Sequence, residues 1–273
     1  MNDLIDQFRL AIAAAGLTPP AEIIDDGVIH RFSTNGKPTH KNGWYMLHTD
    51  GIAAGAFGDW REGFTQNWCS KADTSMTESE RLAHRERVKA MQRQREDDLA
   101  QRQQLAAAEA LMRWLAATPC THHDYLTRKS IQPHGAKIEG DKLLIPMRDA
   151  AGKVHSLQTI APDGLKMFMS GGRVKGCYFG IGKPKGALIV CEGFATGASI
   201  HECTGHTVAV AFNAGNLEPV VVALRSKYPT LKIIIAADDD HQTPGNPGIT
   251  KATAAVQATG ATLAVPVFKA TTS

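Results

Sequence analysis

The C-terminal half of the chain alternates apolar runs with helix-like segments, and this pattern limits the fold more than any other feature. "ALIVCEG" is followed by "FATGASIHECTG" and "HTVAVAF", and the alternation continues through "NLEPVVVALRSKYP", "LKIIIAADDD", "GITKATAAVQATG" and "TLAVPVF". The apolar runs are almost continuous, as in strands that are buried on both faces. The pattern therefore predicts an α/β fold in which four mainly parallel strands carry helices on both faces.

Acidic side chains follow two of these strands. Glu192 comes directly after "ALIVC", and three aspartates follow "KIIIAA". The carboxyl ends of parallel strands share one edge of the sheet, where the active crevice of such folds lies. Asp238 and Asp240 are alternate residues, so extended backbone projects them to one side while Asp239 points elsewhere. We therefore expect three carboxylates to converge on a space suited to Mg²⁺ or Mn²⁺, although a solvated turn is the alternative for adjacent acids.

Three further segments precede this unit, which we place at residues 184–273. Residues 1–70 are predicted to form a small, aromatic-rich α+β domain, and residues 120–183 a β-rich, basic subdomain. Residues 71–119 are predicted to form a long charged helix, because Thr77 and Glu80 stand at capping-box spacing. We expect this helix to be an exposed linker whose C-terminal half, from Leu105 onward, packs on the next domain. A basic face that binds nucleic acid is the less favoured alternative for its charges.

Aromatic residues gather in the N-terminal segment, with basic residues between them. They either form the core of a small β-domain, which we favour, or stack on single-stranded nucleic acid. The aromatic residues are Trp44, Tyr45, Phe57, Trp60, Phe64 and Trp68, and the basic ones are Arg31, Lys37, Lys41 and Arg61.

Composition favours a soluble protein of a reducing compartment. Hydrophobic residues make up 43% and charged residues 21%, and no apolar run is long enough to span a bilayer. The five cysteines are odd in number and form no C-x-x-C pair, which argues against a disulfide framework or a zinc ribbon. A mixed site of His30, His40, His48 and Cys69 is disfavoured by its irregular spacing, so zinc is not expected. The net charge of +3 is compatible with a nucleic-acid partner without being evidence for one.

The acidic motifs resemble those of the Toprim family, the catalytic fold of bacterial-type primases, topoisomerases and related nucleases. The matching stretches are "VCEGFATGASI" and "AADDDHQTPGNPGITKA". The resemblance implies that the family's glutamate is Glu192 and that its D-x-D aspartates are Asp238 and Asp240. It assigns metal-binding and catalytic roles to these three residues. "AVAFNAGNL" is similar to the loop after the second Toprim strand.

The stretch upstream is similar to the region that precedes Toprim in primases. Residues 141–180 contain an apolar-Pro strand, a D-x-x-G turn and a lysine near a small-residue loop, and "HHDYLTRKSI" resembles the opening segment of plasmid and phage primases. The resemblance implies a metal-dependent DNA primase, a nucleotidyltransferase that makes short primers for plasmid or phage replication in the bacterial cytoplasm. Its expected partners are a single-stranded DNA template, nucleoside triphosphates and a separate replicative helicase, with no membrane. A Toprim nuclease and a non-catalytic single-stranded-DNA-binding protein are the alternatives.

Anionic substrates require cations in the cleft. Lys166 and Lys175 match family positions best, although solvation is the alternative for any surface lysine. Asn213 and Asn216 either position a nucleotide or cap the helix that starts near Leu217. The candidates for nucleotide or DNA binding are Lys142, Arg148, Lys166, Arg173, Lys175, Asn213, Asn216 and Lys251.

Overall fold

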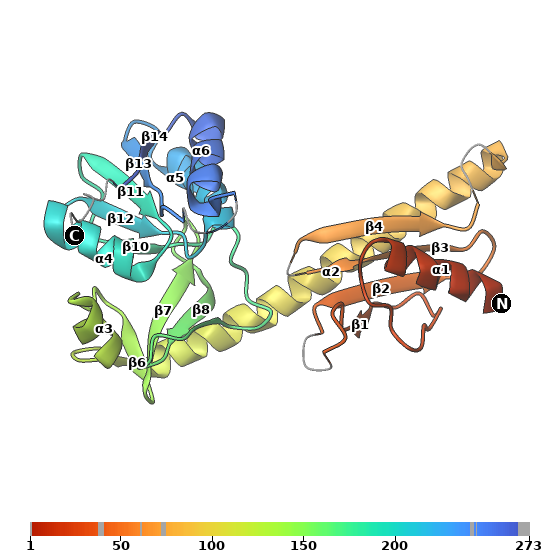
Figure 1. The fold of residues 1–273 in the computed structure, drawn as a ribbon, viewed down its shortest axis with the longest axis horizontal. Coiled ribbons are helices and arrows are strands. Elements are labelled where there is room, and N and C mark those ends of the chain that lie inside the picture. The colour runs from red at the N-terminus through yellow and green to blue at the C-terminus, as the bar shows by residue number, and fades with distance from the viewer. Residues whose placement is uncertain are drawn as a thin grey trace, which may run out of the picture. The chain divides into compact units, whose positions relative to one another are not determined.

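The chain forms two compact units, Met1–Ala100 and Gln101–Ser273, whose helices and strands are labelled in Figure 1. The computed structural model describes residues 2–37, 41–60, 62–71, 75–240, 243 and 245–266. The sequence predicts a finer division, with boundaries after residues 70, 119 and 183, and that division stays a prediction. No helix in the described part of the chain combines the length and apolarity that crossing a membrane requires.

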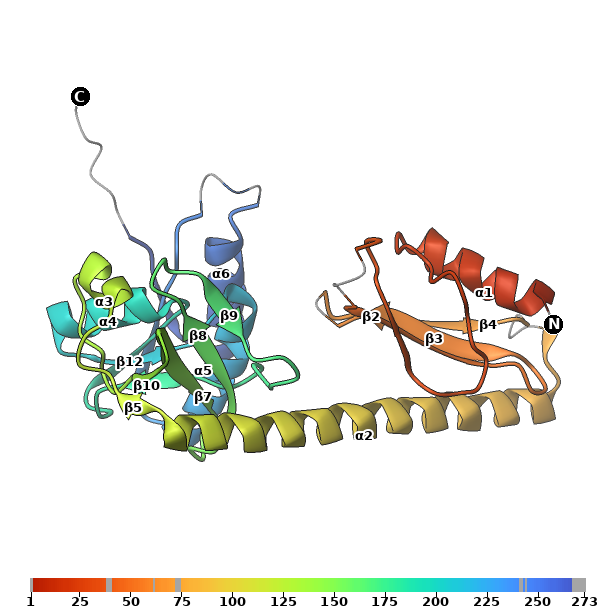
Figure 2. The same ribbon diagram turned by 90° about the horizontal axis from the view of Figure 1, so that it is seen from below.

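The first unit is an antiparallel sheet between two helices. The strands lie in the order β1-β2-β3-β4. Helix α1 covers one face, where Phe8 and Ile12 pack with Tyr45 and Phe57, and the first part of α2 runs along the other face (Figure 2). Its elements are α1 (Asn2–Ala14), β1 (His30–Phe32), β2 (Gly43–His48), β3 (Ala54–Asp59), β4 (Phe64–Cys69) and α2 (Glu78–Ala116), which continues into the second unit.

The aromatic residues of this unit serve mainly as its core, as the favoured interpretation expects. Trp44, Tyr45 and Phe57 are buried, and Phe64 and Trp68 pack against the same cluster as Tyr45. Of the interleaved basic residues, Arg31 lies over the ring of Trp60. Arg61 falls outside the described residues, as does His40 of the disfavoured mixed metal site.

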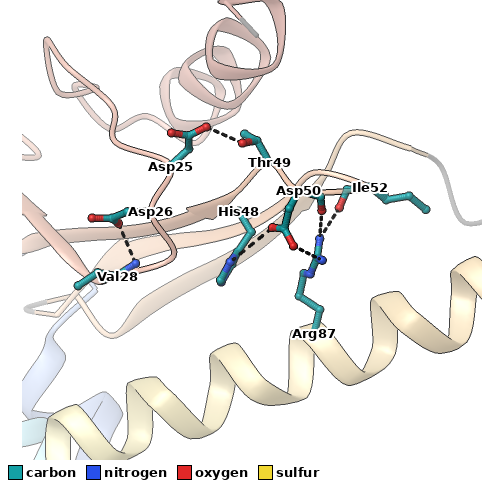
Figure 3. A network of polar contacts seen from close by, with 8 residues as sticks. All are labelled: Asp25, Asp26, Val28, His48, Thr49, Asp50, Ile52 and Arg87. Carbon is teal, nitrogen blue, oxygen red and sulfur yellow. Dashed lines mark hydrogen bonds and ion pairs between the residues drawn. The ribbon is translucent and has the colours of Figure 1, made fainter.

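The first part of α2 is not the exposed linker expected from the sequence. Met91 is buried because it packs against Met46 and Ala54 on the outer face of the sheet. Arg87 fastens the helix to the turn between β2 and β3 (Figure 3). Its guanidinium donates to the carbonyls of Asp50 and Ile52, the latter at 3.0 Å, and pairs with the Asp50 carboxylate at 2.9 Å. A sparse apolar stripe thus suffices to dock the helix, because the sheet offers a matching apolar surface.

The second unit begins with an antiparallel sheet in the strand order β5-β6-β7-β8-β9. The second part of α2 covers one of its faces: Ala110, and Ala117 directly after the helix, pack with Leu144 and Leu157. Alanines make this contact because they let the helix approach closely, whereas Leu105, where the packing was expected to start, is 66% exposed. The elements are β5 (Thr118–Pro119), α3 (Asp124–Lys129), β6 (Lys137–Glu139), β7 (Lys142–Arg148), β8 (Val154–Ile160) and β9 (Lys166–Phe168).

The rest of the unit is the predicted α/β fold. Four parallel strands lie in the order β12-β11-β13-β14, and β10 adds a fifth, antiparallel strand beside β12. The fifth strand comes from "FGI", which the sequence assigns to the preceding subdomain. The elements are β10 (Phe179–Ile181), β11 (Ala187–Cys191), α4 (Phe194–Thr204), β12 (Thr207–Val210), α5 (Leu217–Lys227), β13 (Lys232–Ala236), α6 (Pro247–Thr259) and β14 (Thr262–Ala264).

Helices cover both faces of this sheet, as predicted (Figure 1). Ile189 and Cys191 face α4 and the antiparallel sheet, whereas Leu188 and Val190 face α5 and α6. The close approach of α4 depends on Gly197, where an added Cβ would lie 2.7 Å from a methyl of Val210. Since both faces are buried, polar side chains of this sheet can reach solvent only at its edges. The acidic residues lie at the carboxyl edge.

Candidate active site

Glu192 lies at the carboxyl end of β11, the central strand of the sheet. The residue before it, Cys191, is in register with Val210 of β12 and Ala236 of β13, so the three strands end nearly level. Glu192 Oε1 is buried and has no hydrogen-bond partner in the described part of the chain. Burial, reinforced by the charges of two aspartates, raises the pKa of this carboxyl to about 7. A buried carboxylate oxygen without a partner is costly, and a bound cation would remove that cost.

The two aspartates are Asp238 and Asp240, the outer members of the acidic triplet. Asp238 lies two residues beyond the end of β13, and burial, followed by the charge of Asp240, raises its pKa. Both aspartates raise the pKa of Glu192. The structure thus places the three carboxylates expected from the sequence close enough for the two aspartates to affect the ionisation of Glu192, and for Asp240 to affect that of Asp238.

The start of α6 holds the aspartate loop in place. The Gly248 N–H donates to Asp240 Oδ2 at 3.2 Å, and the Asn246 side chain accepts from the Asp240 N–H at 3.0 Å. Asn246 also donates to the carboxylate of Asp239 at 2.8 Å, whereas the carboxylate of Asp240 accepts from Gly248. A Cβ at Gly248 would lie 2.3 Å from the Asp238 carbonyl oxygen, so this position needs glycine. The sequence reasoning missed Asn246 and Gly248, although "NPG" after the acids is a helix N-cap signal.

Lys166 is the predicted cation that lies at the carboxylates. Among the predicted basic residues, Lys166 alone affects the pKa of Asp238. Its positive charge lowers this pKa, whereas burial raises it. The pKa of Lys166 is itself lowered, first by the protein atoms around its ammonium and then by the charge of Lys129. Its Nζ lies 5.9 Å from the centroid of the Tyr125 ring. Lys129 ends α3 and was not singled out from the sequence, although "HHDYLTRKSI" contains it.

The other predicted cations have different surroundings. Arg173 pairs with Asp149 at 3.4 Å, and Asp149 also pairs with His155 at 2.7 Å. Arg148 donates to a backbone carbonyl within its own turn and lies 5.6 Å from the centroid of the Trp114 ring. These contacts lie within the antiparallel sheet and its turns, and a role of the two arginines in nucleotide or DNA binding stays a prediction. The remaining predicted cations are exposed lysines, Lys142, Lys175 and Lys251.

The two asparagines of "FNAGN" differ in role. Asn216 is buried, and its amide accepts from the Gly176 N–H at 2.8 Å and donates to the carbonyls of Cys177 and Ala211. It makes no side-chain cap bond to α5, so it acts neither as the cap nor as an exposed contact for a nucleotide. It ties the loop before β10 to the end of β12. Asn213 is partly exposed at the same edge of the sheet as Glu192.

Among the described residues, no group of three or more His, Cys, Asp and Glu side chains is placed so that it could hold a metal ion. An open site needs fewer ligands from the protein. Mg²⁺ is commonly held by one or two carboxylates, with water and substrate phosphates as its other ligands. The unpartnered oxygen of Glu192 and the raised pKa of Asp238 fit such a site.

The fold and the acidic edge define a Toprim unit. Residues 187–271 match the family model described as Toprim domain. The chain is also similar to two Escherichia coli proteins named DNA primase TraC. It is 35% identical to one over 285 residues, covering 96% of this chain and 26% of the relative. It is 36% identical to the other over 289 residues, covering 96% of this chain and 19% of the relative.

The chain therefore spans about a quarter, or less, of the length of these relatives. A solved structure of the DnaG primase catalytic domain bound to ssDNA has a TM-score of 0.45 and 10% identity, over 63% of this chain and 73% of that chain. The resemblance to Toprim-domain DNA primases that the motifs suggested is confirmed by the family match and the two TraC relatives.

Proposed function

We propose that this protein is a DNA primase that makes short primers on single-stranded DNA for plasmid or phage replication in the bacterial cytoplasm. The observation that carries the proposal is the buried, unpartnered Oε1 of Glu192, together with the charges of Asp238 and Asp240 that raise the pKa of this carboxyl. Lys166 lies near enough to Asp238 to act on its ionisation. Both curated relatives bear the name of a DNA primase, which supports the same function. The substrates would be nucleoside triphosphates and a DNA template, and a separate helicase would open the duplex.

In primer synthesis a ribose 3′-hydroxyl attacks the α-phosphorus of a nucleoside triphosphate, and the bond to pyrophosphate breaks. Negative charge spreads over the non-bridging oxygens, so catalysis depends on alignment and electrostatic stabilisation. Bound Mg²⁺ or Mn²⁺ would supply much of that stabilisation. Glu192, Asp238 and Asp240 would hold the metal, and Lys166 would offset phosphate charge beside Asp238. In the alternative role, Glu192 would accept the proton of the attacking hydroxyl instead of binding the metal, and the pKa of about 7 that it has without a metal suits that role.

The test is synthesis on single-stranded templates with labelled nucleotides and Mg²⁺ or Mn²⁺. Wild-type protein should make short products, and Asp238→Asn and Asp240→Asn should make none. The matched control is Asp239→Asn, which keeps an acceptor for Asn246 and should retain most activity. Cleavage of the template without synthesis would instead identify a nuclease. Binding of the template that survives all three substitutions, again without synthesis, would identify a non-catalytic DNA-binding protein.

A further inference from the structure

Strand β9 crosses the carboxyl edge of the parallel sheet. At one of its ends Lys166 lies close enough to Asp238, beyond β13, for the two charges to act on each other. At the other end the Phe168 ring meets the Phe212 ring edge to face, with centroids 6.4 Å apart and planes at 83°. Lys166 and Phe168 are alternate residues of one strand, so they share a face.

Phe212 places this aromatic contact just beyond the edge that carries the acids. Cys191 is in register with Val210, and the Ala211 N–H donates to the Cys191 carbonyl at 2.8 Å. Ala211 therefore follows at the level of Glu192, and Phe212 comes one residue further along. Since β11 lies between β12 and β13, β9 passes from the Phe212 side of Glu192 to the Asp238 side.

The backbone at Phe212 is strained. Its φ is 74°, in the left-handed region that bulky residues rarely adopt. Such conformations persist where the surroundings impose them, and they concentrate at binding and active sites. Here the strained backbone buries the Phe212 ring, which is 8% exposed, and presents it to Phe168.

Phe168 itself is 43% exposed, although it is a large aromatic residue braced by Phe212. An exposed ring on one face of a strand, with a lysine two residues away on that face, matches the two parts of a nucleotide. A base can stack on the ring while its phosphate meets the ammonium. The two side chains start roughly 7 Å apart along the strand, a span that one nucleotide bridges.

We propose that Phe168, braced by Phe212, is a platform on which a nucleobase stacks while Lys166 contacts the phosphate of that nucleotide. The inference rests on the proposed function, since it assigns the base-binding part of the same site. The base belongs either to the template strand or to the incoming nucleoside triphosphate.

The experiment measures binding with two pairs of probes, without catalysis. One pair is a thymidine oligonucleotide and an abasic strand of equal length, and the other is a nucleoside triphosphate and inorganic tripolyphosphate. Phe168→Ala should weaken binding of the base-containing probe in at least one pair by about fivefold or more, with little change for its base-free partner. The pair that responds tells whether the base comes from the template or from the incoming nucleotide.

Matched variants separate stacking from packing. Phe168→Trp should keep the affinity because it keeps an aromatic face, whereas Phe168→Leu should lose it although the side chain remains apolar. Met167→Ala, at an exposed residue on the opposite face of β9, should bind like wild type. Normal binding by Phe168→Leu, or equal losses for base-containing and base-free probes in both pairs, would overturn the proposal. Absence of primer synthesis by the wild type would refute the proposed function instead, without touching this binding result.

Discussion

Replacing Glu192 by glutamine should make the metal-free protein more stable above neutral pH. Burial and the two neighbouring aspartates raise the pKa of Glu192 from 4.5 to about 7. A carboxyl whose pKa is higher in the folded than in the unfolded state holds its proton longer in the folded state. Its contribution to stability is therefore fully present below the unfolded pKa and is lost as the pH rises through the folded pKa.

The size of the loss follows from the two pKa values. By proton linkage, wild type should lose about 2.5 kcal/mol of unfolding free energy through this group between about pH 5 and about pH 8. Glutamine resembles the protonated carboxyl and does not titrate, so Glu192→Gln should not show this loss. Other titrating groups act in both proteins, and the difference between the two pH profiles isolates Glu192.

The assay is hydrogen exchange of β11 and β13 in graded urea, with EDTA to remove divalent ions. It reports opening of the unit Gln101–Ser273, whereas tryptophan fluorescence would mix in the other unit, which holds Trp44, Trp60 and Trp68. Saturating Mg²⁺ should restore wild-type stability at the higher pH, because the cation replaces the lost proton, and should do less for Glu192→Gln. Parallel pH profiles for the two proteins would refute the argument.

Three further substitutions test parts of the structure. Gly248→Ala would place a methyl group 2.3 Å from the Asp238 carbonyl oxygen. It should lower the unfolding free energy by roughly 1–3 kcal/mol, which would be measured as a lower Tm. An unchanged Tm would contradict this close approach. Asn216→Asp would place a carboxylate oxygen against two backbone carbonyl oxygens. In urea unfolding it should lower the unfolding free energy of the second unit by about 3 kcal/mol or more. Full stability with weaker nucleotide binding would instead show that Asn216 has a binding role. Arg87→Met should cost the first unit about 1–2 kcal/mol and speed proteolysis of α2 near this residue, while Arg85→Met, at an exposed position of the same helix, should leave both unchanged.

Local patterns in the sequence were sufficient to predict the parallel sheet and the acids at its carboxyl edge. Nearly continuous apolar runs are stable only when both faces of a strand are buried, so they predicted the four parallel strands and the helices on either side. Since parallel strands end at a common edge, they also predicted that Glu192 and the aspartates would meet. The D-x-D spacing separated Asp239 from its neighbours, and in the structure Asp239 indeed bonds to Asn246.

Contacts between distant segments decided the rest. The residues "FGI" joined the parallel sheet because β12 had a free edge, which no pattern within that short strand reveals. Asn216 could be ranked as a cap or a ligand from its neighbours in sequence, but two of its partners, Gly176 and Cys177, come from the distant loop before β10. The contact between the Phe168 and Phe212 rings likewise exists only because two segments 44 positions apart in the sequence meet.

The sequence by itself determined that this chain has a parallel α/β sheet with acids at its carboxyl edge, because burial and strand direction are local consequences of residue order. Only the tertiary structure decided which cation faces those acids and which aromatic rings stand beside them. Such choices depend on the packing of separate elements: the resemblance ranked Lys166 equally with Lys175, and nothing in the sequence around Phe168 or Phe212 indicates that the two rings meet.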